Sequence, residues 1–138
     1  CIRDRLRGEG RCLAFDIGLS RSRLPHFSRA ATELLSRSWP FARLCEYGHW
    51  ADGGTHLVVV WRDEDAEADV DEVIAAIQDR VYELAVRDFG GSYSAEHGIG
   101  PHNQRFFDRF ADATTRDLTR TFARHCDPEG LLGRVRLW

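Results

Sequence analysis

The feature that most constrains the fold is the order in which hydrophobic periodicity changes along residues 12–95. Two-residue alternation and β-branched residues predict four strands, at residues 12–19, 41–49, 55–61 and 90–95. Apolar residues at helical spacing predict two helices, one from Leu24 to just before Pro40 and one over 66–88. A Gly pair in "WADGG" is a hairpin signal between the second and third strands.

The resulting order is β-α-β-β-α-β, the split βαβ arrangement. It predicts an α+β fold class: a ferredoxin-like antiparallel sheet of about four strands with both helices on one face. From Pro101 onward the pattern is helical through "NQRFFDRFAD" and "TTRDLTRTFARHC" and stops at "DPEG". We therefore expect one domain over 1–138, with a ferredoxin-like core at 12–95 and an active-site loop with a helical tail at 96–138.

Composition argues against several classes of protein. The net charge is −3, from 19 Lys and Arg against 22 Asp and Glu, which is not the balance of a nucleic-acid surface. The longest apolar run, Leu57–Trp61, is far too short for a transmembrane segment. The N-terminal sequence lacks the apolar stretch of a signal peptide. The four cysteines form no CxxC pair and are expected to be reduced thiols, so the predicted location is cytoplasmic.

Two histidines flank the predicted hairpin turn. His49 and His56 are seven positions apart, so their imidazoles are expected near the facing ends of adjacent strands. Two such histidines make half a metal site, and a carboxylate would complete a set with open positions for water or substrate. Glu96, at the end of the fourth predicted strand, is the candidate carboxylate. The alternative is that all three are independent polar residues at strand ends.

The stretch "AEHGIG" places His97 directly after Glu96. Neighbouring side chains of an extended strand point to opposite faces, so one of the pair could bind a metal while the other meets a different group. An imidazole can accept a proton from a substrate hydroxyl near neutral pH. Gly98 and Gly100 would let a flat cofactor or a substrate approach the backbone. The alternative is a tight turn between a strand and a helix.

Three motifs together resemble a known family. "GHWADGGTH", then "SAEHGIG", then "DPEGLL" are similar to GHxGDGNxH, (S/G)(A/G)EHGxGxxK and DPxxxLNPGK of the C-terminal substrate domain of the FAD-linked oxidases. These include the D-lactate, glycolate and D-2-hydroxyglutarate dehydrogenases of the vanillyl-alcohol oxidase superfamily. The segment "FDIGLSRSRLPHF" resembles the family's strand-to-helix entry. The resemblance covers essentially the whole chain, in the right order and spacing.

The resemblance implies roles by position. His49 and His56 match the two metal-liganding histidines and Glu96 the third ligand of a divalent ion, zinc or similar, that orients a 2-hydroxy acid. His97 matches the histidine proposed to take the hydroxyl proton while hydride passes to FAD. Gly98 and Gly100 match the glycines of the loop that approaches the flavin.

The chain departs from the family pattern at several positions. Gly54 replaces an Asn, Ala51 a Gly and Asn103 a Lys, and the segment 133–136 reads "GRVR" where the family has "NPGK". The usual Pro after the first strand's Asp is also missing. The implied ligand set and His97 are unchanged.

The resemblance also implies a partner. In this family FAD is held mainly by an N-terminal domain, so we expect either that this sequence is a fragment of a longer enzyme, inactive alone, or that another chain supplies the flavin domain. The alternative function is a non-catalytic ferredoxin-like module that binds a metal, a small acid or only a partner. An Arg that binds the substrate carboxylate is expected among these candidates or outside the sequence: Arg3, Arg5, Arg21 and Arg23.

Overall fold

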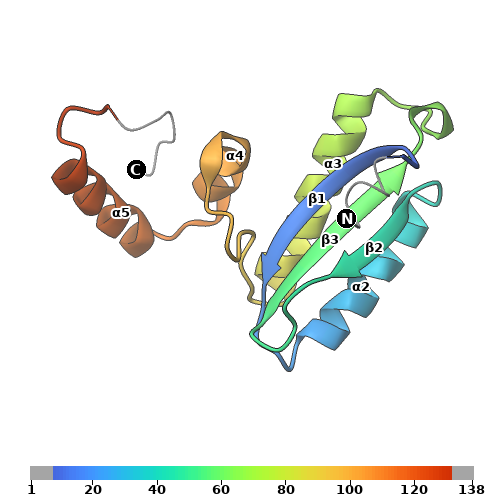
Figure 1. Ribbon diagram of the computed structural model, residues 1–138, viewed down its shortest axis with the longest axis horizontal. Helices are drawn as coiled ribbons and strands as arrows, with labels where there is room; N and C mark the ends of the chain where they lie inside the picture. The colour runs from blue at the N-terminus through green and yellow to red at the C-terminus, as the bar shows by residue number, and fades with distance from the viewer. Residues whose placement is uncertain (1–7, 132–138) are drawn as a thin grey trace. The chain divides into compact units, whose positions relative to one another are not determined.

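The computed structural model describes residues 8–131, so Cys1, Arg3, Arg5 and the segment 133–136 lie outside the described residues. The chain divides into two compact units, Cys1–Glu96 and His97–Trp138. The first unit is built on an antiparallel sheet. Its strands are β1 (Arg11–Gly18), β2 (Arg43–Tyr47) and β3 (Gly54–Trp61), in the order β1-β3-β2 (Figure 1).

Two main helices accompany this sheet: α2 (Leu24–Ser38) and α3 (Val70–Glu83). Pro25 lies in the first turn of α2, where its missing N–H costs no hydrogen bond. The carboxylate of Asp69 caps α3 by accepting from the N–H groups of Asp71 and Glu72. A single π-helical turn, η2 (Leu84–Asp88), continues α3, and a short 3₁₀ turn, η1 (Asp63–Asp65), follows β3.

Both helices pack on the same face of the sheet, as the sequence predicts (Figure 1). Leu57 of β3 pairs with Phe15 on one side and Glu46 on the other, so these three side chains share a face. Phe15 meets Tyr82 of α3 with ring centroids 5.1 Å apart. Glu46 accepts a hydrogen bond from Ser28 of α2. The next residues along each strand therefore occupy the opposite face, which neither α2 nor α3 covers (Figure 1) and which we call the open face, although Val58 and Val60 are buried on it.

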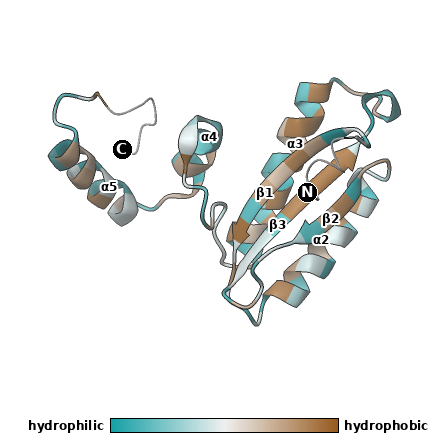
Figure 2. Cartoon of the chain, in the orientation of Figure 1, coloured by the Kyte–Doolittle hydropathy of each residue, from teal (hydrophilic) through white to brown (hydrophobic). Residues whose placement is uncertain are grey.

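The core of the first unit lies between the sheet and these helices. Its fully buried side chains come from both the sheet and the helices: Phe15, Ile17, Leu24, Phe27, Leu35, Leu57, Val59, Ile77 and Val81. Figure 2 shows β3 changing from pale at its beginning to hydrophobic toward its end. The α+β fold class and the antiparallel sheet with helices on one face are confirmed.

The fourth predicted strand is not formed as a strand. The described residues contain three strands, and the segment 90–95 contributes an isolated antiparallel bridge between Gly18 and Ser92. Its hydrogen bonds join Ser92 N–H to the Gly18 carbonyl at 2.7 Å and Gly18 N–H to the Ser92 carbonyl at 3.1 Å. Beyond the bridge, the N–H groups of Ala95 and Glu96 donate to the Asp16 carboxylate. The Asp16 carboxylate therefore shares the Ala95 N–H with the Asp16 carbonyl, which lies 3.2 Å from that nitrogen, and takes the Glu96 N–H as well.

The second unit contains two helices, α4 (Gly100–Phe110) and α5 (Ala113–Cys126), as the sequence predicts. Phe106 and Phe107 of α4 are buried, whereas α5 has no buried residue. Asp112 caps α5 by accepting from Thr115 N–H at 2.7 Å, and this hydrogen bond lowers the pKa of the Asp112 carboxyl. Among residues 8–131, no helix is long and apolar enough to cross a membrane.

Candidate metal and substrate site

The site begins as a row of polar side chains across the open face. His56 of β3 pairs with Asp16 of β1 on one side and with Tyr47 of β2 on the other, so all three project from the same face. The ring centroids of Tyr47 and His56 are 5.5 Å apart. The register of the sheet, fixed by its apolar core on the other face, therefore brings a carboxylate and an imidazole together.

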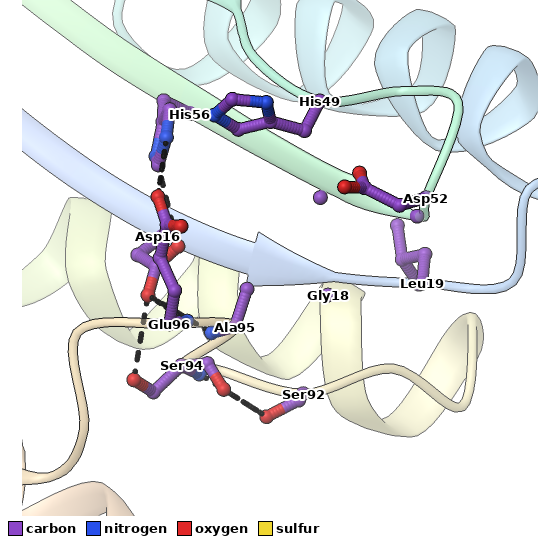
Figure 3. Close-up of a pocket in the computed structure, with 12 residues that line it drawn as sticks. Asp16, Gly18, Leu19, His49, Asp52, His56, Ser92, Ser94, Ala95 and Glu96 are labelled. Atoms are coloured by element: carbon purple, nitrogen blue, oxygen red, sulfur yellow. Dashed lines mark hydrogen bonds and ion pairs between the residues drawn. The ribbon is translucent and has the colours of Figure 1, made fainter.

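Asp16 holds the segment that carries Glu96. Its side chain is buried, with 6% exposed, and Oδ2 accepts from the N–H groups of Ala95 at 2.9 Å and Glu96 at 2.8 Å. The hydroxyl of Ser94 lies 3.4 Å from the same oxygen. These contacts bring residues 94–96 against the end of β1 (Figure 3).

His56 faces two carboxylates through its two ring nitrogens. Nε2 lies 3.0 Å from Glu96 Oε1, and Nδ1 lies 3.6 Å from Asp16 Oδ1. Each of these three residues offers one potential ligand atom, and these atoms lie within 4.8 Å of one another. Imidazole nitrogen and carboxylate oxygen are common ligands of zinc, so the donor set fits a divalent ion.

His49 lies beside His56 but is not part of this close group. The ring centroids of the two histidines are 6.0 Å apart and the rings are nearly perpendicular (Figure 3). Hydrogen bonds to the backbone of His49 hold the hairpin loop together: its carbonyl accepts from the N–H groups of Asp52, Gly53 and Gly54. Its side chain is exposed, so the loop presents the imidazole to solvent next to His56.

These residues line one pocket of about 430 Å³. Its walls come from the end of β1, the hairpin loop and the segment 92–96: Asp16, Gly18, Leu19, His49, Asp52, Gly53, Gly54, His56, Ser92, Ser94, Ala95 and Glu96. The hydrogen bond from Leu19 N–H to the Gly53 carbonyl, at 2.8 Å, joins the first two walls. A cavity of this size can hold a small organic acid together with an ion.

His97 is the first residue of the second unit and follows Glu96 directly. Both His97 and Gly98 are exposed. Gly98 and Gly100 have φ values of 72° and 56°, which favour glycine, and a Cβ at either position would meet nothing within 4 Å. The backbone there is open, which is compatible with the approach of a planar ring. The flavin contact stays a prediction.

The two described arginines on the sequence's candidate list donate to backbone carbonyls. Arg21 contacts Ala51 at 3.5 Å and Arg23 contacts Phe89 at 2.6 Å. Neither lines the pocket of Figure 3.

The sequence analysis named His49, His56 and Glu96, and all three line this pocket. It missed Asp16. The available signal was a charged residue inside the apolar run "LAFDIGL", on the face opposite Phe15 and Ile17. Only the pairing of β1 with β3 shows that this carboxylate lies beside His56.

A helix-backed antiparallel sheet, with an imidazole and carboxylates at one end of its open face, defines a small α+β domain with a candidate metal site. Comparison with known families identifies it further. Residues 3–137 match the family described as FAD linked oxidases, C-terminal domain, and the chain belongs to that family.

Curated relatives agree with this assignment. A D-2-hydroxyglutarate dehydrogenase of Xanthomonas citri pv. viticola is 31% identical over 126 residues, covering 89% of this chain and 26% of that protein. The mitochondrial D-2-hydroxyglutarate dehydrogenase of Rattus norvegicus is 30% identical over 132 residues, covering 95% and 23%. A D-2-hydroxyglutarate–pyruvate transhydrogenase of Saccharomyces cerevisiae is 29% identical over 125 residues, covering 86% and 24%. The chain thus spans about a quarter of the length of these relatives.

Proposed function

We propose that this chain forms the substrate- and metal-binding half of a flavin-dependent oxidoreductase that oxidises a 2-hydroxy acid to a 2-oxo acid. Family membership supports the flavin, and the names of the relatives make D-2-hydroxyglutarate the first acid to test. The observation that carries the proposal is the 3.0 Å approach of His56 Nε2 to Glu96 Oε1 in an open pocket.

The flavin is proposed to come from a domain outside these 138 residues, in the same chain or in another. When bound, FAD supplies the acceptor for the hydride on C2 of the acid, and a divalent ion supplies positive charge for the hydroxyl and carboxylate oxygens. His56, Glu96 and, by resemblance, His49 would hold that ion. Asp16 keeps Glu96 at the pocket through the backbone contacts described above.

His97 is the proposed base. Because it follows Glu96 directly, its Cα lies about 3.8 Å from that of the proposed metal ligand. It would accept the hydroxyl proton as the C2–H bond passes its electron pair to the flavin. The substrate then loses one hydride and one proton, and the C–O bond becomes the carbonyl of the 2-oxo acid.

Stopped-flow reduction of the bound flavin by D-2-hydroxyglutarate tests this proposal in the complete protein. His97→Ala is expected to slow reduction roughly 10²–10⁴-fold, the usual contribution of a positioned base. Substrate affinity should change much less, because the ion would still hold the carboxylate. His102→Ala is the matched control, since His102 is an exposed histidine of α4, and it should reduce its flavin at close to the parent rate.

Two outcomes would contradict the proposal. If the His97→Ala protein reduces its flavin at the parent rate, the histidine has no part in proton transfer. If the parent protein is reduced by none of a panel of D- and L-2-hydroxy acids, the substrate class is wrong.

A further inference from the structure

We infer that Gly18 and Gly54 are specificity-determining residues, and that they make the pocket prefer 2-hydroxy acids with an extended substituent on C2. Together they form a part of the pocket wall without side chains, which we call the glycine floor. The inference rests on the proposed function and adds to it the size of the acid. It is carried by two facing glycines that the backbone conformation does not require.

The two glycines face each other in the sheet, one row beyond the polar residues of the site. Gly18 of β1 is the register partner of Gly54 of β3, and each lies two residues along its strand from Asp16 or His56. Side chains at these positions would therefore project from the open face. At a rise of about 3.4 Å per residue, the glycine pair lies about 7 Å from the Asp16–His56 pair. Both glycines line the pocket, and Figure 3 shows Gly18 between Asp16 and Leu19.

Neither backbone strain nor crowding explains the two glycines. Gly18 and Gly54 are not among the glycines with positive φ. A Cβ on Gly54 would meet its nearest neighbour, His49 Cβ, at 3.7 Å, and a Cβ on Gly18 would meet Ala95 Cβ at 3.5 Å, both ordinary contacts. Gly53 differs, with a φ of 99° and a Cβ position 2.5 Å from a carbonyl oxygen. Glycine weakens a strand, and it often marks a place where a ligand approaches the backbone closely.

The proposed ion determines which part of the acid lies over the glycine floor. An ion at His56 and Glu96 would hold the hydroxyl and carboxylate groups, so a substituent on C2 extends into the remaining volume of the pocket. Opposite Cβ atoms of an antiparallel pair are about 4.5–5.5 Å apart, so two side chains on the glycine floor would occupy that volume. Buried Leu19 offers an apolar contact beyond the floor. Glycolate, which has no substituent on C2, would leave the glycine floor uncovered.

Gly54→Ala tests the inference by adding one methyl group to the glycine floor. In the complete protein, dissociation constants are measured from the saturation of flavin reduction by glycolate, D-2-hydroxybutyrate and D-2-hydroxyglutarate. The parent should bind the two longer acids more tightly than glycolate. In Gly54→Ala their affinity should fall about 10-fold or more, the usual effect of a one-methylene misfit, whereas the affinity for glycolate should not change.

Two further variants complete this test. Gly18→Ala fills the glycine floor from the other strand and should give the same size-dependent loss, so the test holds even if Gly54→Ala does not fold. Ala14→Val is the matched control, because Ala14 is an exposed residue on the same face of β1 and does not line the pocket. Its affinity for every acid should stay close to that of the parent.

A second measurement needs no turnover. Isothermal titration with glyoxylate, 2-oxobutyrate and 2-oxoglutarate should show the same dependence on size, and zinc affinity should be unchanged in Gly54→Ala. An equal loss for all acids, or a matching loss of zinc affinity, would show a general disturbance of the site and overturn the inference. A parent that binds glycolate and glyoxylate as tightly as the longer acids would also overturn it.

The two measurements separate this inference from the proposed function. If the parent binds the 2-oxo acids but no 2-hydroxy acid reduces its flavin, the proposed reaction fails, and the dependence of binding on size still decides the role of the glycine floor. If flavin reduction is normal and Gly54→Ala and Gly18→Ala match the parent for every acid, the proposed function stands and this inference fails. If the parent binds no acid of either series, both fail.

Discussion

His56 is the residue on which the proposed metal site depends, since its Nε2 is the imidazole nitrogen that faces Glu96. His56→Ala should therefore lower zinc affinity by more than roughly 10–100-fold, which is the usual effect of removing a residue that only hydrogen-bonds to a metal ligand. His49→Ala should have a similar effect if the exposed imidazole turns toward the ion. Isothermal titration with zinc measures both, and His102→Ala, which removes an exposed histidine of α4, serves as the control.

The outcomes separate the two histidines. If His56→Ala bound zinc as tightly as the parent, the metal site would not lie at this end of the sheet. Parent-like affinity of His49→Ala would restrict the ligands to the closer group of His56 and the carboxylates, and would show that the ligand set implied by the resemblance does not hold here.

At single residues, sequence reasoning could find side chains whose type and spacing suggest chemistry. His49 and His56 flank a hairpin turn, and Glu96 precedes a histidine and two glycines. Asp16 could not be found in the same way, because its role depends on which residue of β3 lies opposite. That register is set by packing on the other face of the sheet, which pairs Asp16 with His56.

At the scale of elements, periodicity was a good guide to β1, α2, β3 and α3, because each has buried apolar residues facing one core. It was a poor guide to residues 90–95. This segment has little apolar alternation, and its backbone pairing with β1 is limited to the bridge at Ser92 and one hydrogen bond from Ala95 N–H to the Asp16 carbonyl. The Asp16 carboxylate then takes the donors of Ala95 and Glu96.

Gly91→Ala is expected to disturb both stability and the site. A Cβ at this position would lie 2.6 Å from the Gly18 carbonyl oxygen and 2.3 Å from a methyl carbon of Leu19. Overpacking of this kind typically costs about 1–3 kcal/mol, and the displaced segment carries Glu96. Urea unfolding and zinc titration of the same variant should therefore show lower stability and weaker binding together.

Gly18→Ala is the matched control for that variant. Gly18 is the bridge partner of Ser92, yet a Cβ there would meet its nearest neighbour at 3.5 Å, an ordinary contact. It should unfold close to the parent. If Gly91→Ala were as stable as Gly18→Ala, the expected clash of the new Cβ with the Gly18 carbonyl would be wrong.

At the scale of the whole molecule, the chain supplies a site with open sides. The pocket is open to solvent, His97 and Gly98 are exposed, and the chain spans about a quarter of the length of its relatives. These observations support the proposal that a flavin-binding domain completes the enzyme. The sequence could indicate that partner only through the resemblance. Hydrophobic periodicity reports helices and strands within this chain, and it carries no signal for contact with a domain outside the chain.

The metal site is the central claim, and anomalous diffraction from crystals grown with zinc tests it most directly. We predict one peak in the pocket, about 2.0–2.2 Å from His56 Nε2 and from a carboxylate oxygen of Glu96. His49 is predicted to be the third protein ligand, and His56 Nδ1 should still face Asp16. Zinc found only elsewhere on the protein, or a His56 ring turned away from Glu96 in these crystals, would contradict the account.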